Sequence, residues 1–310
     1  MAKTILYGHP ICAEHDPGKR HPESGARLGA IEEALAAESF AELERREAPV
    51  GEPEILAWAH DERLVDAILD NVPSEGHVAI DADTVMSPAS GEAARRAAGA
   101  VAAAVDAVFA GEASNAFCAV RPPGHHAEPR RPMGFCLFNN VVIGAERARR
   151  TLGLTRIAVV DFDVHHGNGT QAAFERDGDL FFGSTHQSPL YPGTGAVTET
   201  GVGNIVNAPL SAGTGSTGFR DAMESRLLPA LRAHRPELIL ISAGFDAHRD
   251  DPLANLELVE EDYTWITTEL VRVAGELCEG RVVSTLEGGY NLRALGASAA
   301  AHVQALMAAQ

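Results

Sequence analysis

Two carboxylates and two imidazoles fall within six residues near the middle of the chain. The run DFDVHHGNGT covers residues 161–170 and directly follows the apolar run TRIAVV. Alternate side chains of a β-strand point to the same face, so Asp161, Asp163 and His165 can converge on one point beyond the strand. Carboxylate oxygens together with an imidazole nitrogen suit zinc or a similar divalent ion. The run therefore predicts a metal site, although a loop whose acids and histidines only hydrogen-bond to the backbone would contain the same residues.

Three further stretches carry side chains that could act together with such a metal. The adjacent His125 and His126 lie in a loop rich in Pro and Gly, where they could serve as acid and base toward a water molecule. One more carboxylate, Asp246, closely follows the buried-strand run LILISA, and the phenol of Tyr290 follows two glycines after the run RVVSTL. Ligands of α/β sheets collect beyond the carboxyl ends of the strands. All four motifs are therefore expected at one edge of a sheet.

In these four motifs and their order, the chain resembles the histone deacetylase family of zinc amidohydrolases, and it is most similar to the class II branch. The resemblance runs from about His21 to the last helix. It implies an arginase-deacetylase fold, in which a central, mostly parallel sheet carries helices on both faces, and a single catalytic domain over residues 1–310. It also implies that Asp163, His165 and Asp246 are zinc ligands, which leaves room for a water molecule and the substrate carbonyl.

The resemblance implies a role for each catalytic side chain. His126 is expected to be the general base and acid, and His125 its electrostatic partner, oriented by Asp161. Asn168 stands where many relatives have an aspartate next to the base, so the base should feel less negative charge. Tyr290 is expected to donate a hydrogen bond to the tetrahedral oxyanion. A tyrosine at this position predicts an enzyme with real turnover.

A monovalent cation site is implied as well. In the family, potassium lies behind the zinc, and the matching groups here are the side chain of Asp161, the backbones of Asp163 and His165, and the hydroxyl of Ser184. For Ser184, an ordinary hydroxyl at a strand end is the alternative.

The resemblance also implies a narrow channel for the acylated chain. Phe135 and Tyr191 match its two aromatic walls, with Gly134 and Gly289 keeping the path narrow enough for methylene groups. Ordinary core positions are the alternative for both aromatic side chains. Leu253 stands at a rim position where polyamine deacetylases carry a glutamate, which disfavours acetylpolyamine substrates of that kind.

Asp83 matches a second rim position, which can bind a backbone amide of the substrate, but it could equally cap the helix that follows.

Two functions compete with a zinc amidohydrolase. A di-manganese ureohydrolase shares the fold but needs a second carboxylate two residues after Asp246, where this chain has His248. A non-catalytic module would keep the pocket to bind acylated ligands. The acyl donor stays open between lysine side chains, small acylated amines including acetylpolyamines, and other amides or esters.

The elements that must position these motifs alternate between strand and helix. The strand-like runs are KTILYG (3–8), AFCAV (116–120), RIAVVDF (156–162), LFFGS (180–184), LILISA (238–243) and RVVSTL (281–286). Helical runs cover residues 25–38, 88–111, 140–153, 218–234 and 260–278. This alternation predicts a parallel sheet with helices on both faces. The run NIVNAPLSA (204–212) is too interrupted by polar residues for a buried strand, so the GTGSTG that follows is not expected to bind a dinucleotide.

Composition limits the partners and the location. The net charge of −18 argues against a nucleic-acid surface, which would be basic. The four cysteines show no CxxC spacing, which favours a reducing compartment. The first residues lack the features of a signal peptide, and no run of about eighteen apolar residues could span a membrane. We therefore expect a cytoplasmic protein that acts on an acylated lysine peptide or a small acylated amine, and leave open whether it forms a homo-oligomer.

Overall fold

Eight parallel strands form the central sheet of the structure, a computed structural model that describes residues 3–309. In the order in which they lie side by side, the strands are β2 (Glu44–Glu47), β1 (Thr4–Gly8), β5 (Asn115–Cys118), β10 (Val282–Leu286), β9 (Leu238–Ala243), β6 (Ile157–Asp161), β7 (Leu180–Gln187) and β8 (Ile205–Leu210). A short antiparallel pair, β3 (Val78–Ala79) and β4 (Val85–Met86), lies outside this sheet. The expected single-domain α/β fold is confirmed.

Five of the six inner strands are buried along their whole length. All residues of β5, β6, β7, β9 and β10 are buried, which explains why runs such as IAVV of β6 and LILI of β9 are continuously apolar rather than alternating. A strand with this pattern needs cover on both faces, and helices supply it.

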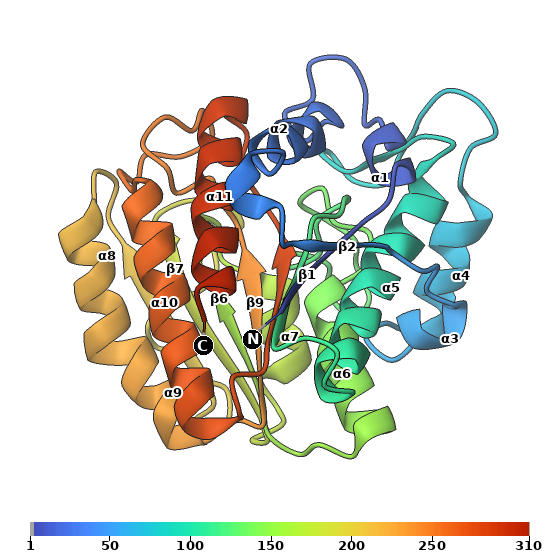
Figure 1. The fold of residues 1–310 in the computed structure, drawn as a ribbon. Coiled ribbons are helices and arrows are strands. Elements are labelled where there is room, and N and C mark those ends of the chain that lie inside the picture. Colours follow the sequence, from blue (N-terminus) through green and yellow to red (C-terminus); the bar gives the residue numbers. More distant parts are fainter. Residues whose placement is uncertain (1–2, 310) are drawn as a thin grey trace.

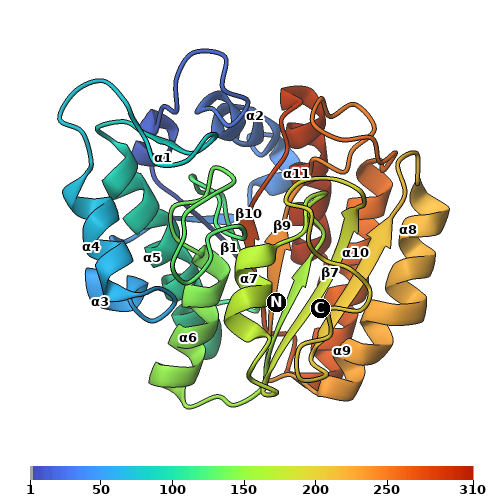
Figure 2. The same ribbon diagram turned by 180° about the vertical axis from the view of Figure 1, so that it is seen from behind.

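Helices lie on both faces of the sheet, as Figures 1 and 2 show from opposite sides. One face carries α2 (Ala26–Ala34), α8 (Ser216–Ala222), α9 (Leu228–His234), α10 (Glu260–Leu277) and α11 (Leu292–Met307). The other face carries α5 (Ser90–Phe109), α6 (Asn140–Leu152) and α7 (Asn168–Phe174). The other helices of the N-terminal part are α1 (Ile11–Glu14), η1 (Glu38–Phe40), α3 (Pro53–Leu56) and α4 (Glu62–Asp70). No helix within residues 3–309 has both the length and the apolar character needed to cross a membrane.

Two sequence predictions need correction. The run NIVNAPLSA does contain a strand, β8, at the outer edge of the sheet, where the partly exposed Pro209 costs no ladder hydrogen bond. The helix expected over 218–234 is divided into α8, a π-helical segment (Met223–Leu227) and α9, with Pro229 in the first turn of α9. The loop GTGSTG follows β8. Its Gly213 N–H donates to the carbonyl of Asn255 (2.6 Å) and is therefore not free for a dinucleotide phosphate.

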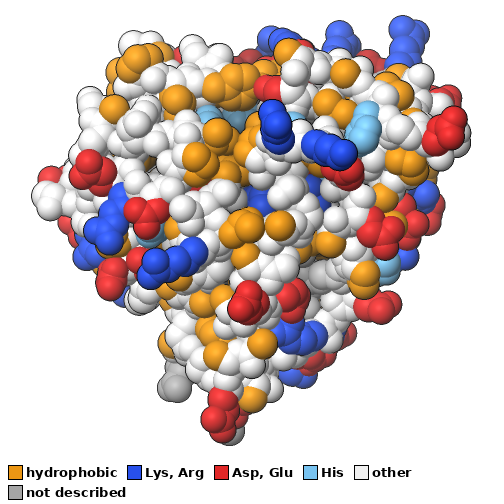
Figure 3. All heavy atoms as spheres, turned by 90° about the horizontal axis from the view of Figure 1, so that it is seen from above, with side chains coloured by type: hydrophobic (Ala, Val, Ile, Leu, Met, Phe, Trp, Pro, Cys, Tyr) orange, Lys and Arg blue, Asp and Glu red, His pale blue; other side chains and the backbone are white. Residues whose placement is uncertain are grey.

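The carboxyl ends of β6 and β9 lie at nearly one level, and β7 continues past it to Gln187. Asp161, the last residue of β6, is in register with Ser184 of β7 and with Ser242 of β9. The loops that follow these strands lie at the top of Figure 1 and are seen from above in Figure 3, where hydrophobic side chains and several Lys and Arg side chains lie in the central part of the face. The sheet thus brings the four predicted motifs to one edge.

Candidate active site

Asp163, His165 and Asp246 converge at the ends of β6 and β9. The His165 Nδ1 atom lies 3.1 Å from Asp163 Oδ1 and 3.1 Å from Asp246 Oδ2, and all three side chains are buried. Within residues 3–309, this is the one group of at least three His, Cys, Asp or Glu side chains whose possible ligand atoms lie within 4.8 Å of one another. The structure therefore brings together the three residues that were expected to hold the metal.

Two buried carboxylates that face one imidazole nitrogen need a positive charge. Burial, followed by the charge of Asp163, raises the pKa of Asp246. Burial alone would lower the pKa of His165, but its hydrogen bonds with Asp163 and Asp246 outweigh this and raise that pKa to about 10. The positive charge can be a proton on His165 or a divalent cation that replaces it. Two carboxylate oxygens and one imidazole nitrogen match a zinc site that keeps a position open.

Backbone N–H groups fix the two carboxylates. The Gly288 N–H donates to Asp163 Oδ2 (2.8 Å), and the Val164 N–H donates to Asp246 Oδ1 (2.9 Å). A Cβ atom at Gly288 would collide with the Asp246 carboxylate, and one at Gly244 would collide with that of Asp163. Glycine at these positions lets the backbone approach the ligands closely enough to hold them before a metal binds.

The adjacent histidines have different partners. His125 Nδ1 lies 2.9 Å from Asp161 Oδ2, and His126 Nδ1 lies 2.8 Å from Asn168 Oδ1. Burial lowers the pKa of His125, but the charges of Asp163 and Asp161 outweigh it and raise that pKa well above 6.5. Burial and the neighbouring cationic His125 hold the pKa of His126 well below 6.5. The arrangement thus suits His126 to accept a proton near neutral pH.

Glu287 fixes the loop that carries these histidines, and sequence reasoning missed it. Its Oε2 atom accepts hydrogen bonds from the backbone N–H groups of Gly124 (2.7 Å) and His125 (3.1 Å). The side chain is fully buried, and this burial raises its pKa to about 7. One sequence signal could have identified Glu287: it is a carboxylate at the end of an apolar strand run, directly before Gly288.

Arg27 and Asp251 hold the segment that presents Tyr290, and both were also missed. The Arg27 guanidinium lies 5.0 Å from the centroid of the Tyr290 ring and donates through Nε to the Gly289 carbonyl (2.7 Å). Asp251 Oδ2 accepts from the Tyr290 N–H (2.7 Å). Burial raises the pKa of the Tyr290 phenol well above 10, so it remains a hydrogen-bond donor. Arg27 is 263 residues from Tyr290 in the sequence, so no local pattern could reveal this pairing.

A cavity of about 190 Å³ unites most of the predicted site. Its lining residues are Asp83, His126, Gly134, Phe135, His165, Leu190, Tyr191, Leu253 and Tyr290. The rings of Phe135 and Tyr290 lie 5.9 Å apart between centroids, and those of His126 and Tyr191 lie 5.1 Å apart, each pair edge to face. Phe135 and Tyr191 are therefore cavity residues rather than core.

Gly289 does not line this cavity, contrary to expectation. Its Cβ position faces Leu295 and Phe245 behind the segment, and its positive φ of 122° serves the turn that leads to Tyr290. The predicted narrowing of the channel at this residue is therefore not seen.

Asp83 belongs to the cavity rim and caps no helix. Its Oδ1 atom accepts from the Gly134 N–H (3.2 Å) and from the Thr84 hydroxyl (2.9 Å), whereas α5 begins only at Ser90. At the same rim, the ring of His21 packs edge to face against Phe135, with 4.6 Å between centroids. Sequence reasoning did not identify His21 as a neighbour of the cavity.

The predicted potassium ligands lie close together, but the side chain of Ser184 is already engaged. Its hydroxyl lies 2.9 Å from His186 Nδ1, and the side chain is fully buried. The Asp161 Oδ1 atom accepts from the Asp163 N–H (3.1 Å). Potassium binding stays a prediction.

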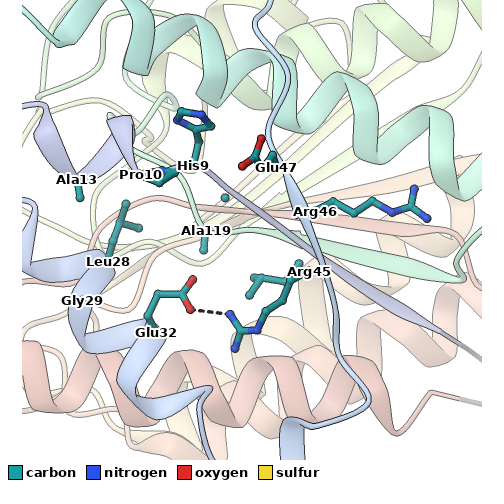
Figure 4. Close-up of a pocket in the computed structure, with 12 residues that line it drawn as sticks. His9, Pro10, Ala13, Leu28, Gly29, Glu32, Arg45, Arg46, Glu47 and Ala119 are labelled. Atoms are coloured by element: carbon teal, nitrogen blue, oxygen red, sulfur yellow. Dashed lines mark hydrogen bonds and ion pairs between the residues drawn. The ribbon is translucent and has the colours of Figure 1, made fainter.

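A larger cavity, of about 440 Å³, lies apart from these residues beside β1 and β2 (Figure 4). Its walls include Leu28, Gly29 and Pro10, and its charged groups are partly paired, with Arg45 donating to Glu32 (2.6 Å). None of the predicted site residues lines it. The smaller cavity is therefore the candidate active site.

Comparisons with known proteins agree with this choice. Residues 21–306 match the histone deacetylase domain. The chain is 41% identical to "Histone deacetylase 14, chloroplastic" of Arabidopsis thaliana, over 98% of this chain and 76% of that protein. It is 38% identical to the "Histone deacetylase-like amidohydrolase" of Pseudomonas aeruginosa, over 91% of this chain and 74% of that protein.

A solved structure gives the same result for the fold. The crystal structure of the HDA15 HD domain superimposes with a TM-score of 0.93 at 36% sequence identity, covering 99% of this chain and 88% of that one. The sequence match and the structural match extend over nearly the whole chain. The chain therefore belongs to the histone deacetylase family of deacetylases and amidohydrolases.

Proposed function

We propose that this protein is a zinc-dependent amidohydrolase that removes acetyl or related acyl groups from lysine side chains or small acylated amines. The observation that carries the proposal is the convergence of Asp163, His165 and Asp246 at a cavity that also contains His126 and Tyr290. Asp163, His165 and Asp246 would hold the zinc ion. A zinc ion bound there supplies Lewis-acid polarisation of the substrate carbonyl and acidifies water.

His126 carries the proton transfers in this mechanism. Its Nδ1 donates to Asn168 Oδ1, so the free lone pair lies on Nε2. Because its pKa is held low, the ring is neutral near pH 7 and can take a proton from the attacking water. The same nitrogen then delivers that proton to the leaving amine.

Tyr290 stabilises the charge that develops on the carbonyl oxygen. Its phenol lines the cavity together with His126, and Arg27 and Asp251 fix its backbone and ring. A donor that is already oriented needs little reorganisation as the charge develops, which is the basis of oxyanion stabilisation. His125, kept cationic by Asp161 and Asp163, adds a positive charge beside the base.

The rim supports a neutral rather than a polycationic substrate. Leu253 lines the cavity where a carboxylate would be needed to pair with a distal ammonium group. Phe135 and Tyr191 offer aromatic surfaces to a methylene chain. Acetyl-lysine side chains fit this description better than acetylpolyamines. We also propose that the protein is located in the cytoplasm.

The test combines metal analysis with a substrate panel. The purified protein should contain about one zinc per chain and should hydrolyse an acetyl-lysine reporter peptide. Chelation should abolish turnover, and added zinc should restore it. The same preparation is tested on acetylated polyamines, small amides and arginine. Turnover of arginine with two metals per chain would support a ureohydrolase instead, and metal binding without any turnover would support an acyl-ligand binding module.

A further inference from the structure

Behind the base His126 lies a chain of side-chain hydrogen bonds that leads to Glu128. The Asn168 amide lies between them: its Oδ1 is 2.8 Å from His126 Nδ1, and its Nδ2 is 2.8 Å from Glu128 Oε1. Nδ2 also lies 3.4 Å from the Met133 sulfur. Every polar atom of the Asn168 side chain therefore has a partner.

The partners of Asn168 decide which way its amide faces. An amide nitrogen can only donate, whereas an ionised carboxylate and a thioether sulfur can only accept. Glu128 and Met133 together therefore require Nδ2 on their side, which places Oδ1 toward His126. The reversed amide would set an oxygen against the Glu128 carboxylate and the Met133 sulfur. The network thus supports the amide orientation found in the structure.

The amide orientation in turn decides the tautomer of His126. An oxygen opposite Nδ1 requires that Nδ1 carry the proton, which leaves the lone pair on Nε2. A reversed amide would place a donor opposite Nδ1 and would favour the other tautomer, with the proton on Nε2. That tautomer cannot accept a proton at Nε2, and a histidine base held in the wrong tautomer loses most of its activity.

Glu128 is itself held in place by its backbone. Its N–H donates to the Arg131 carbonyl (2.9 Å), and its carbonyl accepts from His60 Nδ1 (3.0 Å). His60 Nε2 accepts from the Asn139 N–H (2.8 Å), at the start of α6. The next residue is also anchored, because the Pro129 carbonyl accepts from the Asp61 N–H (2.9 Å). The carboxylate therefore starts from a fixed point beside α7.

We propose that Glu128 is a positioning residue that sets the tautomer of the base His126 by orienting the Asn168 amide, with Met133 as the secondary acceptor. Its catalytic importance rests on the proposed function, because only a reaction that needs a base at Nε2 makes the tautomer matter. The carboxylate need not contact the substrate, since it is absent from the cavity lining.

The experiment compares two substitutions at one position. Glu128→Gln keeps an oxygen that can accept from Asn168, whereas Glu128→Met has a similar length and no strong acceptor. The tautomer of His126 is read from ¹⁵N–¹H correlation spectra of histidine-labelled, zinc-loaded protein, with the His126 signal assigned by its loss in His126→Gln. Glu92→Met, which removes a surface carboxylate paired with Arg96 (2.9 Å), controls for loss of one negative charge.

We expect the wild type, Glu128→Gln and Glu92→Met to carry the proton on Nδ1. In Glu128→Met, a substantial Nε2–H population should form. Its kcat should fall at least about tenfold, which is part of the roughly hundred- to ten-thousandfold that a general base contributes, while KM changes little. In an Asn168→Ala background, Glu128→Met should cause no further loss, because Glu128 acts through Asn168.

Two results would overturn the positioning role: an unchanged Nδ1–H signal in Glu128→Met, whatever its activity, or an equal loss of kcat in the Gln and Met variants. A tautomer that responds to Glu128 in a protein without turnover on any acyl substrate would instead overturn the proposed function.

If Glu128→Met does not fold, a pair of charge-changing substitutions at positions 128 and 168 tests the same proposal. Glu128→Lys places a donor opposite the amide and should favour its reversal, with loss of the Nδ1–H form. Adding Asn168→Asp restores an acceptor toward both neighbours and should recover that form. Failure of the double variant to recover it would overturn the proposal.

Discussion

His125 and His126 lie with their ring centroids 4.0 Å apart, and their Nδ1 atoms face side chains of different charge. His125 faces the carboxylate of Asp161, whereas His126 faces the amide of Asn168. Burial lowers the pKa of both rings, but only His125 has enough negative charge around it to reverse the effect. The pair therefore combines one cationic and one neutral imidazole at the same site.

The pH dependence of kcat/KM should reflect this difference. A lowered pKa means that His126 stays unprotonated at pH values well below 6.5, and a bound divalent cation would lower its pKa further. The acidic limb of kcat/KM, measured on zinc-loaded enzyme from about pH 4.5 to 8.5, should therefore have its midpoint below 6.5. A midpoint at or above 6.5, with the protein folded throughout, would contradict this assignment of the base.

Removing one metal ligand should remove the metal. In Asp246→Ala, one of the two carboxylates at His165 Nδ1 is lost, so zinc content and activity should both fall, with kcat/KM lower by at least about a hundredfold. Asp250→Ala is the matched control, because Asp250 is exposed on the same loop and its backbone interactions remain. Undiminished zinc in Asp246→Ala would rule out this ligand set.

Zinc binding should release a proton. Because the pKa of His165 is raised to about 10 in the absence of metal, its ring is protonated at pH 8 and must lose that proton to bind zinc. The apparent affinity should therefore fall by about tenfold for each unit of decreasing pH below 10. Calorimetry in two buffers with different ionisation enthalpies gives the number of protons. A value near zero at pH 8 would mean that His165 is neutral before the metal binds.

Tyr290→Phe should retain the fold and the metal but lose most of kcat. The phenol's hydrogen bond strengthens as charge develops on the carbonyl oxygen, and loss of one such donor raises the barrier by about 2.7–4 kcal/mol. KM should change much less. Because Arg27 stacks on the ring rather than on the hydroxyl, phenylalanine keeps that contact. A near-wild-type kcat in zinc-loaded Tyr290→Phe would mean that another group faces the oxyanion.

Local sequence patterns predicted the inner strands because apolar runs are a local signal, whereas the candidate metal ligands Asp163, His165 and Asp246 were implied as a set by the family resemblance. The run LILISA is strand β9 to the residue. Strand β6, in contrast, ends at Asp161, so Asp163 and His165 lie in the bend after the strand rather than on one of its faces. The edge strands were missed for a physical reason. All four residues of β2 (ERRE) are charged, which protects an exposed sheet edge but gives no hydrophobic signal.

The residues that hold the site in place were hidden for a different reason. Glu287 contacts the loop at His125, and Glu128 reaches the site through Asn168, so each depends on the folded chain bringing distant segments together. A carboxylate in a loop or at a strand end has many possible uses. Only the burial and the partners in the structure distinguish a positioning residue from a solvated acid.

The rim residue Leu253 should disfavour polycationic substrates. It lines the cavity beside Tyr290, and its N–H donates to Asp251 Oδ1 (3.0 Å), which fixes its backbone. Leu253→Glu should therefore place a carboxylate at the entrance and raise kcat/KM for acetylpolyamines relative to an acetyl-lysine peptide by about two- to fivefold, the scale of one exposed ion pair worth about 0.5–1 kcal/mol.

The control is Leu152→Glu, which adds the same charge at the exposed end of α6 and should leave the ratio unchanged. Both substrates are measured with each variant at low and high salt, because an ion pair at the rim weakens as ionic strength rises. A wild-type protein that already prefers acetylpolyamines, or a Leu253→Glu variant with an unchanged ratio, would show that this position does not select the substrate.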